Sequence, residues 1–212
     1  NMMVMDKKGS HEFTDILELN NGDYWLTSWG MGVVTLDRTF KKKQYNIFKP
    51  RPASWPLATK LGVTLTWCMH QEKASGDVWI GSNGGILTRY NPVTDKTTYY
   101  NPPEFANATV RYITEDKKGR LWFSTQRGRI IVYDNKKFTV VKDYGTAIIP
   151  KLLFDKDGWL WAAVQGTGIV AINSETGQIL QQYTKGDNGL FASTGTDIDQ
   201  LNDSTIAFGA SA

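Results

Sequence analysis

Short apolar segments alternate with turns along the whole chain, and four of these segments share one pattern. In each copy a glycine stands three residues before a tryptophan, and a polar residue lies twelve positions after that tryptophan. The tryptophans are Trp25, Trp79, Trp122 and Trp161, and the polar residues are Asp37, Asn91, Asp134 and Asn173. Offsets that coincide in four copies indicate an internal repeat.

The apolar segments within each repeat have the length of strands rather than of helices. In the third copy we expect strands at 110–115, 120–125, 130–133 and 138–142. The turns at 116–119 and 155–158 begin with an aspartate and end with a glycine, which suits tight turns with a positive φ. Each repeat is therefore predicted to be one sheet of four antiparallel strands, and no amphipathic helix is expected.

The spacings between the tryptophans are 54, 43 and 39 residues, which bracket the length of a four-stranded propeller blade. A weaker fifth copy has Ala207 at the tryptophan position. We therefore predict an all-β fold, a β-propeller with four complete blades and parts of two more, in which each tryptophan fills the space between neighbouring blades. The expected divisions are 1–12 as the end of a preceding blade, then blades at 13–62, 63–108, 109–146 and 147–194, and the start of another at 195–212.

Composition excludes several classes of protein. The net charge is only +3 and no long basic run occurs, which argues against a nucleic-acid partner. Cys68 is the single cysteine, so no intramolecular disulfide can form. No stretch of about 18 apolar residues is present to span a membrane. We expect the sequence to be a piece of a longer protein, because it stops in the middle of a repeat.

The repeat resembles the two-component regulator propeller repeat, whose pattern is Val/Ile-x-x-Ile-x-Glu-Asp-x-x-Gly-x-Leu-Trp-Ile-Gly-Thr followed by Gly-Gly-Leu-x-x-Tyr-Asp. Residues 113–125 and 77–86 carry this likeness most closely. The resemblance implies a seven-bladed propeller in the periplasmic half of a hybrid two-component receptor, before a histidine kinase, and many such receptors respond to oligosaccharides from complex glycans. The sequence departs from that pattern because it contains neither a membrane helix nor a kinase.

Ligand binding is expected where the turns between second and third strands meet the links between blades, because loops at one face of a propeller converge around its axis. Four residues lie four positions after their tryptophans: Trp29, Asn83, Gln126 and Gln165. An aromatic ring and three amides suit a sugar, since the ring covers an apolar sugar face and amides both donate and accept hydrogen bonds. The alternative is that these are ordinary polar turn residues.

Two further residues are candidates for the same ligand. Arg127 stands where the other copies have glycine, and with Arg129 it could hold the carboxylate of an acidic sugar, or simply be solvated. Trp55 lies among prolines in the longest link between blades, where it either contacts a ligand or packs on its own blade. Trp67 and Arg111 open first strands near the same rim and are weaker candidates.

Catalysis has less support. His11 and His70 are the only histidines, and with one cysteine they do not form the ligand set of a zinc site. Asp197 and Asp199 would point to one side of a strand and could serve acid–base chemistry, but such pairs more often cap turns or face solvent. We expect no catalytic residue, no metal and no cofactor.

The main hypothesis is an extracytoplasmic, periplasmic sensing domain that binds a glycan fragment or similar polar ligand on the turn-rich face. A propeller scaffold that binds protein on the same rim, and a propeller polysaccharide lyase or hydrolase, are the alternatives. An open propeller exposes two sheet faces, so we also expect a tendency to form a homodimer.

Overall fold

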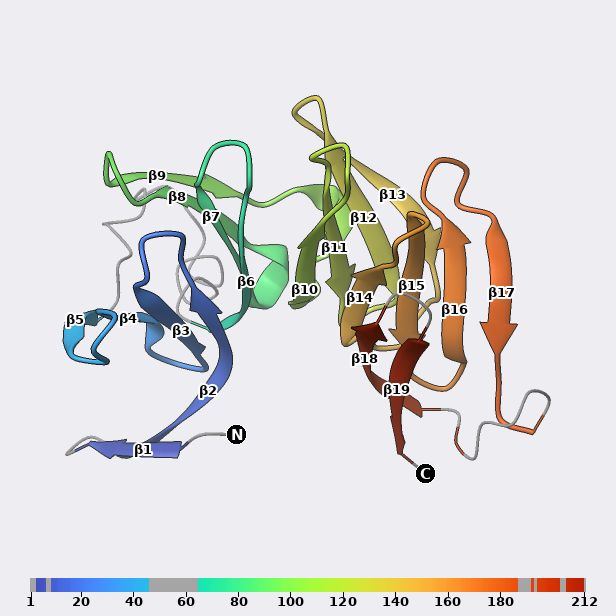
Figure 1. Ribbon diagram of the computed structural model, residues 1–212, viewed down its shortest axis with the longest axis horizontal. Coiled ribbons are helices and arrows are strands. Elements are labelled where there is room, and N and C mark those ends of the chain that lie inside the picture. Colours follow the sequence, from blue (N-terminus) through green and yellow to red (C-terminus); the bar gives the residue numbers. More distant parts are fainter. Residues whose placement is uncertain are drawn as a thin grey trace. The chain divides into compact units, whose positions relative to one another are not determined.

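The computed structural model describes residues 3–6, 9–45, 65–186, 192, 194–202 and 205–211. The chain divides into two compact units, Asn1–Val110 and Arg111–Ala212. Among the described residues the regular elements are antiparallel strands and two single-turn 3-10 helices (Figure 1). Within this part of the chain no helix has the length and hydropathy that a membrane crossing requires.

The first unit contains two sheets whose strands follow one another in chain order (Figure 1). The first sheet has the strands β1 (Met3–Asp6), β2 (Gly9–Glu18), β3 (Tyr24–Ser28), β4 (Gly32–Leu36) and β5 (Lys42–Tyr45). The second has β6 (Thr66–Gln71), β7 (Val78–Ser82), β8 (Leu87–Asn91) and β9 (Lys96–Tyr100). The short helices η1 (Asn83–Gly85) and η2 (Pro103–Phe105) follow β7 and β9.

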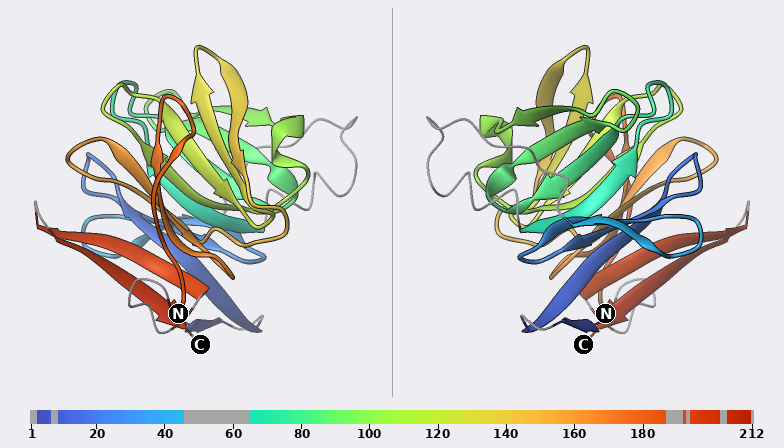
Figure 2. Two further views of the ribbon diagram at one scale, coloured as in Figure 1. Left: turned by 90° about the vertical axis from the view of Figure 1, so that its right-hand side faces the viewer. Right: turned by 90° about the vertical axis from the view of Figure 1, so that its left-hand side faces the viewer.

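The second unit repeats this arrangement in two four-stranded sheets and a two-stranded ribbon (Figure 2). One sheet has β10 (Val110–Glu115), β11 (Leu121–Thr125), β12 (Arg129–Asp134) and β13 (Lys137–Asp143). The next has β14 (Lys151–Phe154), β15 (Trp159–Val164), β16 (Gly168–Asn173) and β17 (Ile179–Tyr183), and the ribbon has β18 (Thr194–Asn202) and β19 (Thr205–Ser211). The predicted all-β fold of four-stranded antiparallel blades is confirmed.

The beginning of the chain forms a hairpin. β1 pairs with the first half of β2, with Met3 opposite Glu12 and Asp6 opposite Gly9, so this pairing lies within the segment 1–12 that we expect to be the end of a preceding blade. An antiparallel neighbour one short turn away satisfies the backbone N–H and C=O groups of a strand at the least cost in chain entropy. The second half of β2 pairs with β3 as the first strand of its blade.

All four repeat tryptophans lie in the second strand of their sheets, and all are at most 7% exposed. Three of them pack against strands of the following sheet within the same unit. Trp25 joins a cluster with Val78 and Ile80, Trp122 one with Leu160 and Val170, and Trp161 one with Ile198. Burying an indole contributes several kcal/mol at about 25 cal/mol per Å². These contacts are why the tryptophan recurs once in every blade.

The residue two positions after the tryptophan lies close to a segment that follows its own sheet in the chain. Thr27 Oγ1 donates to the carbonyl oxygen of Trp67 at 3.3 Å, and Ser124 Oγ donates to that of Ile149 at 2.7 Å. In the second blade this position is Gly81, where an added Cβ would lie 2.8 Å from Val110 Cβ. The approach is close, and the four copies have small residues at this position: Thr27, Gly81, Ser124 and Ala163.

Candidate functional site

Trp29 and Trp67 form an aromatic pair at the predicted rim of the first unit. Their ring centroids are 5.6 Å apart and the rings are nearly perpendicular, at 82°. Trp29 is held by its backbone, which bridges to Leu65 and donates from its N–H to the carbonyl oxygen of Glu12 at 3.1 Å. Its side chain remains 40% exposed. The pair is therefore a rigid aromatic surface that is open to solvent.

Asn83 has a structural role in addition to its place on the same rim. Its backbone N–H donates to the carbonyl oxygen of Leu65 at 2.9 Å, and its side-chain oxygen accepts a hydrogen bond from Thr109 Oγ1 at 2.9 Å. Thr109 lies between η2 and β10, so this bond ties the turn after β7 to the last segment of the first unit. The bond orients the carboxamide of Asn83, which is half-buried.

The equivalent turns of the second unit carry Gln126, Arg127 and Gln165. Gln126 and Arg127 are exposed, whereas Gln165 is half-buried and donates from its backbone N–H to the carbonyl oxygen of Ile148 at 2.9 Å. Trp55 lies outside the described residues. These three turn residues and the aromatic pair belong to different units, so each set is a separate candidate.

The arginine at position 127 has a local explanation. Gly30, Gly84 and Gly166 all have positive φ, and in the third copy that conformation falls one residue later, at Gly128, with φ +67°. An added Cβ on Gly128 would lie 2.7 Å from the carbonyl carbon of Tyr144. Glycine is required at 128, and Arg127 occupies the exposed turn position before it.

Two further candidates are held in ion pairs. Arg129, considered for binding an acidic sugar, pairs with Asp143 at 3.1 Å, and Asp197, considered for catalysis, pairs with Lys151 at 2.8 Å. His70 is half-buried in β6, opposite Trp79. Within the described ranges, no three His, Cys, Asp or Glu side chains are grouped closely enough to hold a metal ion.

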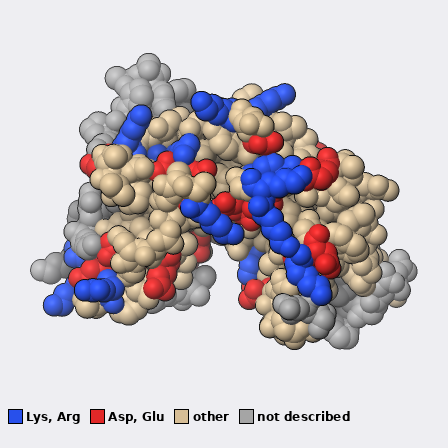
Figure 3. All heavy atoms as spheres, turned by 45° about the horizontal axis from the view of Figure 1, so that its top comes forward, with Lys and Arg blue, Asp and Glu red and all other residues tan. Residues whose placement is uncertain are grey.

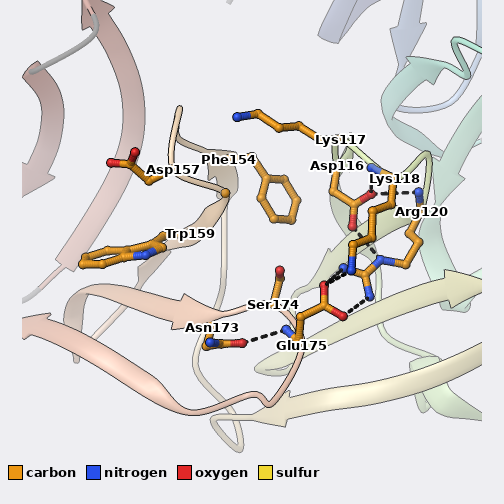
Figure 4. A pocket seen from close by; sticks show the side chains of 11 residues that line it. Asp116, Lys117, Lys118, Arg120, Phe154, Asp157, Trp159, Asn173, Ser174 and Glu175 are labelled. Carbon is orange, nitrogen blue, oxygen red and sulfur yellow. Dashed lines mark hydrogen bonds and ion pairs between the residues drawn. The ribbon is translucent and has the colours of Figure 1, made fainter.

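A pocket of about 380 Å³ lies at the opposite rim of the second unit, which sequence reasoning missed. Three turns line it: the one between β10 and β11, the one between β14 and β15, and the one between β16 and β17. Figure 4 shows Trp159 and Asp157 on one side and the charged cluster of Asp116, Lys118, Arg120 and Glu175 on the other, with Phe154 and Ser174 between them. Phe154 is fixed by an edge-to-face contact with Trp122 at 5.6 Å.

The charged cluster is an ordered network. Arg120 Nε donates to Asp116 Oδ2 at 2.6 Å, and its two terminal nitrogens donate to the carboxylate of Glu175 at 2.6 and 3.3 Å. Lys118 Nζ lies 3.0 Å from Glu175 Oε1. In Figure 3, which brings the top of Figure 1 forward, basic side chains lie beside acidic ones rather than in a field of one sign.

The network also sets the pKa values of its carboxyl groups. Burial by itself raises the pKa of Asp116, but hydrogen bonds from Trp122 and Arg120, together with the guanidinium charge, outweigh burial and lower it. Hydrogen bonds from Lys118 and Arg120 likewise lower the pKa of Glu175. Both groups therefore remain ionised at neutral pH, and the pocket keeps its fixed charges.

Comparison with known proteins agrees with the repeat and the fold. Residues 104–127 match the family model described as the two component regulator propeller. A search of curated proteins finds no significant match. Two similar solved structures are extracellular domains of proposed hybrid two component systems of B. thetaiotaomicron. The first, BT3049, is 22% identical, with a TM-score of 0.73 over 94% of this chain. The second, BT4673, is 20% identical, with a TM-score of 0.70 over 94% of this chain.

A third similar structure is the virginiamycin B lyase of Staphylococcus aureus, at 18% identity and a TM-score of 0.73 over 98% of this chain. The present chain spans 25% and 28% of the two receptor domains and 66% of the lyase. At these identities the likeness concerns the fold. The chain therefore has a β-propeller fold like that of these extracellular domains and carries, at residues 104–127, a repeat of the two component regulator propeller family.

Proposed function

We propose that this chain is part of the ligand-sensing domain of a two-component receptor, located outside the cytoplasm. The observation that carries this proposal is the regulator propeller repeat at residues 104–127, within a fold like that of two receptor extracellular domains. In such a receptor the kinase would lie in another part of the protein. The propeller's contribution is to bind a ligand and to change the stability of one receptor arrangement relative to another.

The ligand class that we propose is a glycan-derived oligosaccharide or a similar polar molecule. The pair of Trp29 and Trp67 supports it, because an exposed indole held by its own backbone offers a preorganised surface for the apolar face of a sugar ring. The nearby turn residue Asn83 has a carboxamide that is already oriented by Thr109. Amides both donate and accept hydrogen bonds, as sugar hydroxyls require.

Signalling would then depend on a difference in affinity. A ligand that binds two receptor arrangements equally shifts neither, however tightly it binds. A sugar on the aromatic pair would favour the arrangement in which that surface is more accessible. The proposal requires no catalytic group, and the likeness to the virginiamycin B lyase, at 18% identity, concerns the fold alone.

Calorimetric titration of the chain with a panel of neutral and acidic oligosaccharides tests this proposal. We expect saturable binding without product formation, and a loss of about tenfold in affinity for Trp29→Ala, because an indole face contributes on the order of 1–2 kcal/mol. Val93→Ala is a matched control, since Val93 is 90% exposed at the turn after β8. Product formation would indicate an enzyme instead. Unchanged sugar affinity in Trp29→Ala would remove the aromatic pair from the site.

A further inference from the structure

Trp159 is an aromatic residue at a position that is charged in the other three blades. The residue two positions before the repeat tryptophan is Asp23, Asp77, Arg120 and Trp159 in the four copies. In the third blade this residue, Arg120, clamps Asp116 and lies over the Trp122 ring at 5.5 Å. The fourth blade has an indole at the same position.

The replacement leaves an aromatic surface exposed among polar turns. Trp159 is 39% exposed, although it begins β15. Its backbone N–H donates to Asp155 Oδ1 at 2.9 Å, and its ring lies 6.4 Å from the buried Trp161 ring. The side chain therefore projects from a fixed backbone. A large exposed aromatic residue at a position that is charged in the other blades contributes little to the fold and indicates a binding role.

The charges around Trp159 point to an uncharged ligand. The pocket lining contains three cations, Lys117, Lys118 and Arg120, and three anions, Asp116, Asp157 and Glu175, so the formal charges cancel. Each cation already has a partner: Lys117 donates to the carbonyl oxygen of Lys156, Lys118 pairs with Glu175, and Arg120 pairs with Asp116 and Glu175. An anionic ligand would have to break these pairs.

A sugar hydroxyl would instead complete the same network. The side chain of Glu175 is 51% exposed, and Asp157 is exposed on the opposite wall. A carboxylate has about four lone-pair sites, so Glu175 can accept a hydroxyl proton while it keeps both of its cations. The volume of about 380 Å³ falls within the usual range of small-ligand pockets, roughly 300–1,000 Å³.

We infer that this pocket is a binding site for a neutral pyranose sugar, whose apolar face stacks on Trp159 and whose hydroxyl groups donate to Glu175 and Asp157 (Figure 4). This inference rests on the proposed function for the class of ligand, and it names a different site. The pocket lies within the second unit, at the rim opposite the β11–β12 and β15–β16 turns, which carry Gln126 and Gln165.

Titration followed by the NMR signals of the indole N–H groups tests the inference. The probes are cellotetraose, mannotetraose, xylotetraose and maltotetraose, each up to about 10 mM, because one stacked ring gives weak affinity. Trp159→Phe identifies the Trp159 signal. We expect at least one probe to shift that signal saturably. We expect tetragalacturonate, the anionic comparison, to bind more weakly than the best neutral probe.

Two Trp159 variants with a measured thermal midpoint distinguish a loss of binding from a loss of folding. Trp159→Ala removes the ring, and Trp159→Arg copies the residue that the third blade has at this position. We expect both to lower the affinity of the pocket at least about tenfold, followed at the indole signal of the neighbouring Trp161, with an unchanged thermal midpoint, whereas Trp29→Ala leaves the affinity of the pocket unchanged. Unchanged affinity in both Trp159 variants would overturn the inference.

The outcomes separate this inference from the proposed function. Sugar binding that is lost only in Trp29→Ala would overturn the Trp159 site and leave the sensing proposal in place. Binding that is lost only in the Trp159 variants would support the pocket and move the sensing site to it. If no neutral probe shifts the Trp159 signal, the pocket inference is wrong, while binding of another polar ligand in calorimetry would still support sensing.

Discussion

The indole Nε1 of Trp122 donates a hydrogen bond to Oδ2 of Asp116 at 3.0 Å, so the residue that fills the space between two blades also fixes the turn before its own strand. Asp116 uses its other oxygen to accept the backbone N–H groups of Lys118 and Arg120. The fourth blade repeats the bond, from Trp161 to Asp155 at 2.7 Å. Turn and core are thus coupled in each of these blades.

This coupling predicts the effect of Asp116→Asn. The substitution keeps the shape of the side chain but weakens the charge-assisted bonds from Trp122 and Arg120, and the carboxylate is buried. We expect the free energy of unfolding to fall by about 1–3 kcal/mol in urea denaturation. Asp134→Asn, at an exposed position of the same sheet, should change it by less than about 0.5 kcal/mol. Equal effects of the two substitutions would disprove the coupling.

The lowered pKa of Asp116 predicts that the free energy of unfolding decreases at acid pH. The pKa of Asp116 is lower in the folded state, so its contribution is fully present above the ordinary value of about 3.9 and is lost as the pH falls through the folded value. We expect the urea midpoint of the wild-type chain to decrease below about pH 4. Asp116→Asn should show a shallower decrease, and an equally steep one would assign the effect to other groups.

A side chain at Gly168, at the start of β16, is expected to destabilise the fold severely. Its φ is +112°, and an added Cβ would lie 2.1 Å from the carbonyl oxygen of Tyr183. We expect Gly168→Ala to lower the free energy of unfolding by more than about 3 kcal/mol, or to prevent folding, because both strain and a backbone clash arise. Gly145→Ala separates the two causes. Gly145 has φ +68° with nothing within 4 Å of an added Cβ, so we expect a cost of about 1 kcal/mol.

The hydroxyl of Thr66 links the two sheets of the first unit, and its removal tests how much this link contributes to stability. Its hydroxyl is fully buried, accepts the backbone N–H of Ser28 at 3.0 Å and lies 2.8 Å from the carbonyl oxygen of Gly32. Thr66→Val keeps the shape of the side chain and removes these buried hydrogen bonds. We expect a loss of about 2–4 kcal/mol in thermal or urea unfolding. Thr98→Val, at an exposed position of β9, is the control and should be nearly neutral.

Local patterns in the sequence were sufficient to predict the blades. The strands expected at 110–115 and 120–125 agree with β10 and β11 to within one residue, because alternation, strand length and the Asp116 turn are all encoded by neighbouring residues. The weak fifth copy around Ala207 is likewise a strand, β19.

The candidate site depended on tertiary structure. The bond between Arg120 and Glu175 joins residues 55 positions apart, and it exists only because two blades place their turns side by side. Repeat alignment directed attention to Trp29 and Gln126, which share a turn position, but it could not show that Trp159 stands above a pocket. What the sequence alone determined is therefore the repeating blade, because the forces that define a strand and its turn act between near neighbours. Folding alone decided which turns meet, because side chains distant in sequence acquire a common environment only when the sheets pack.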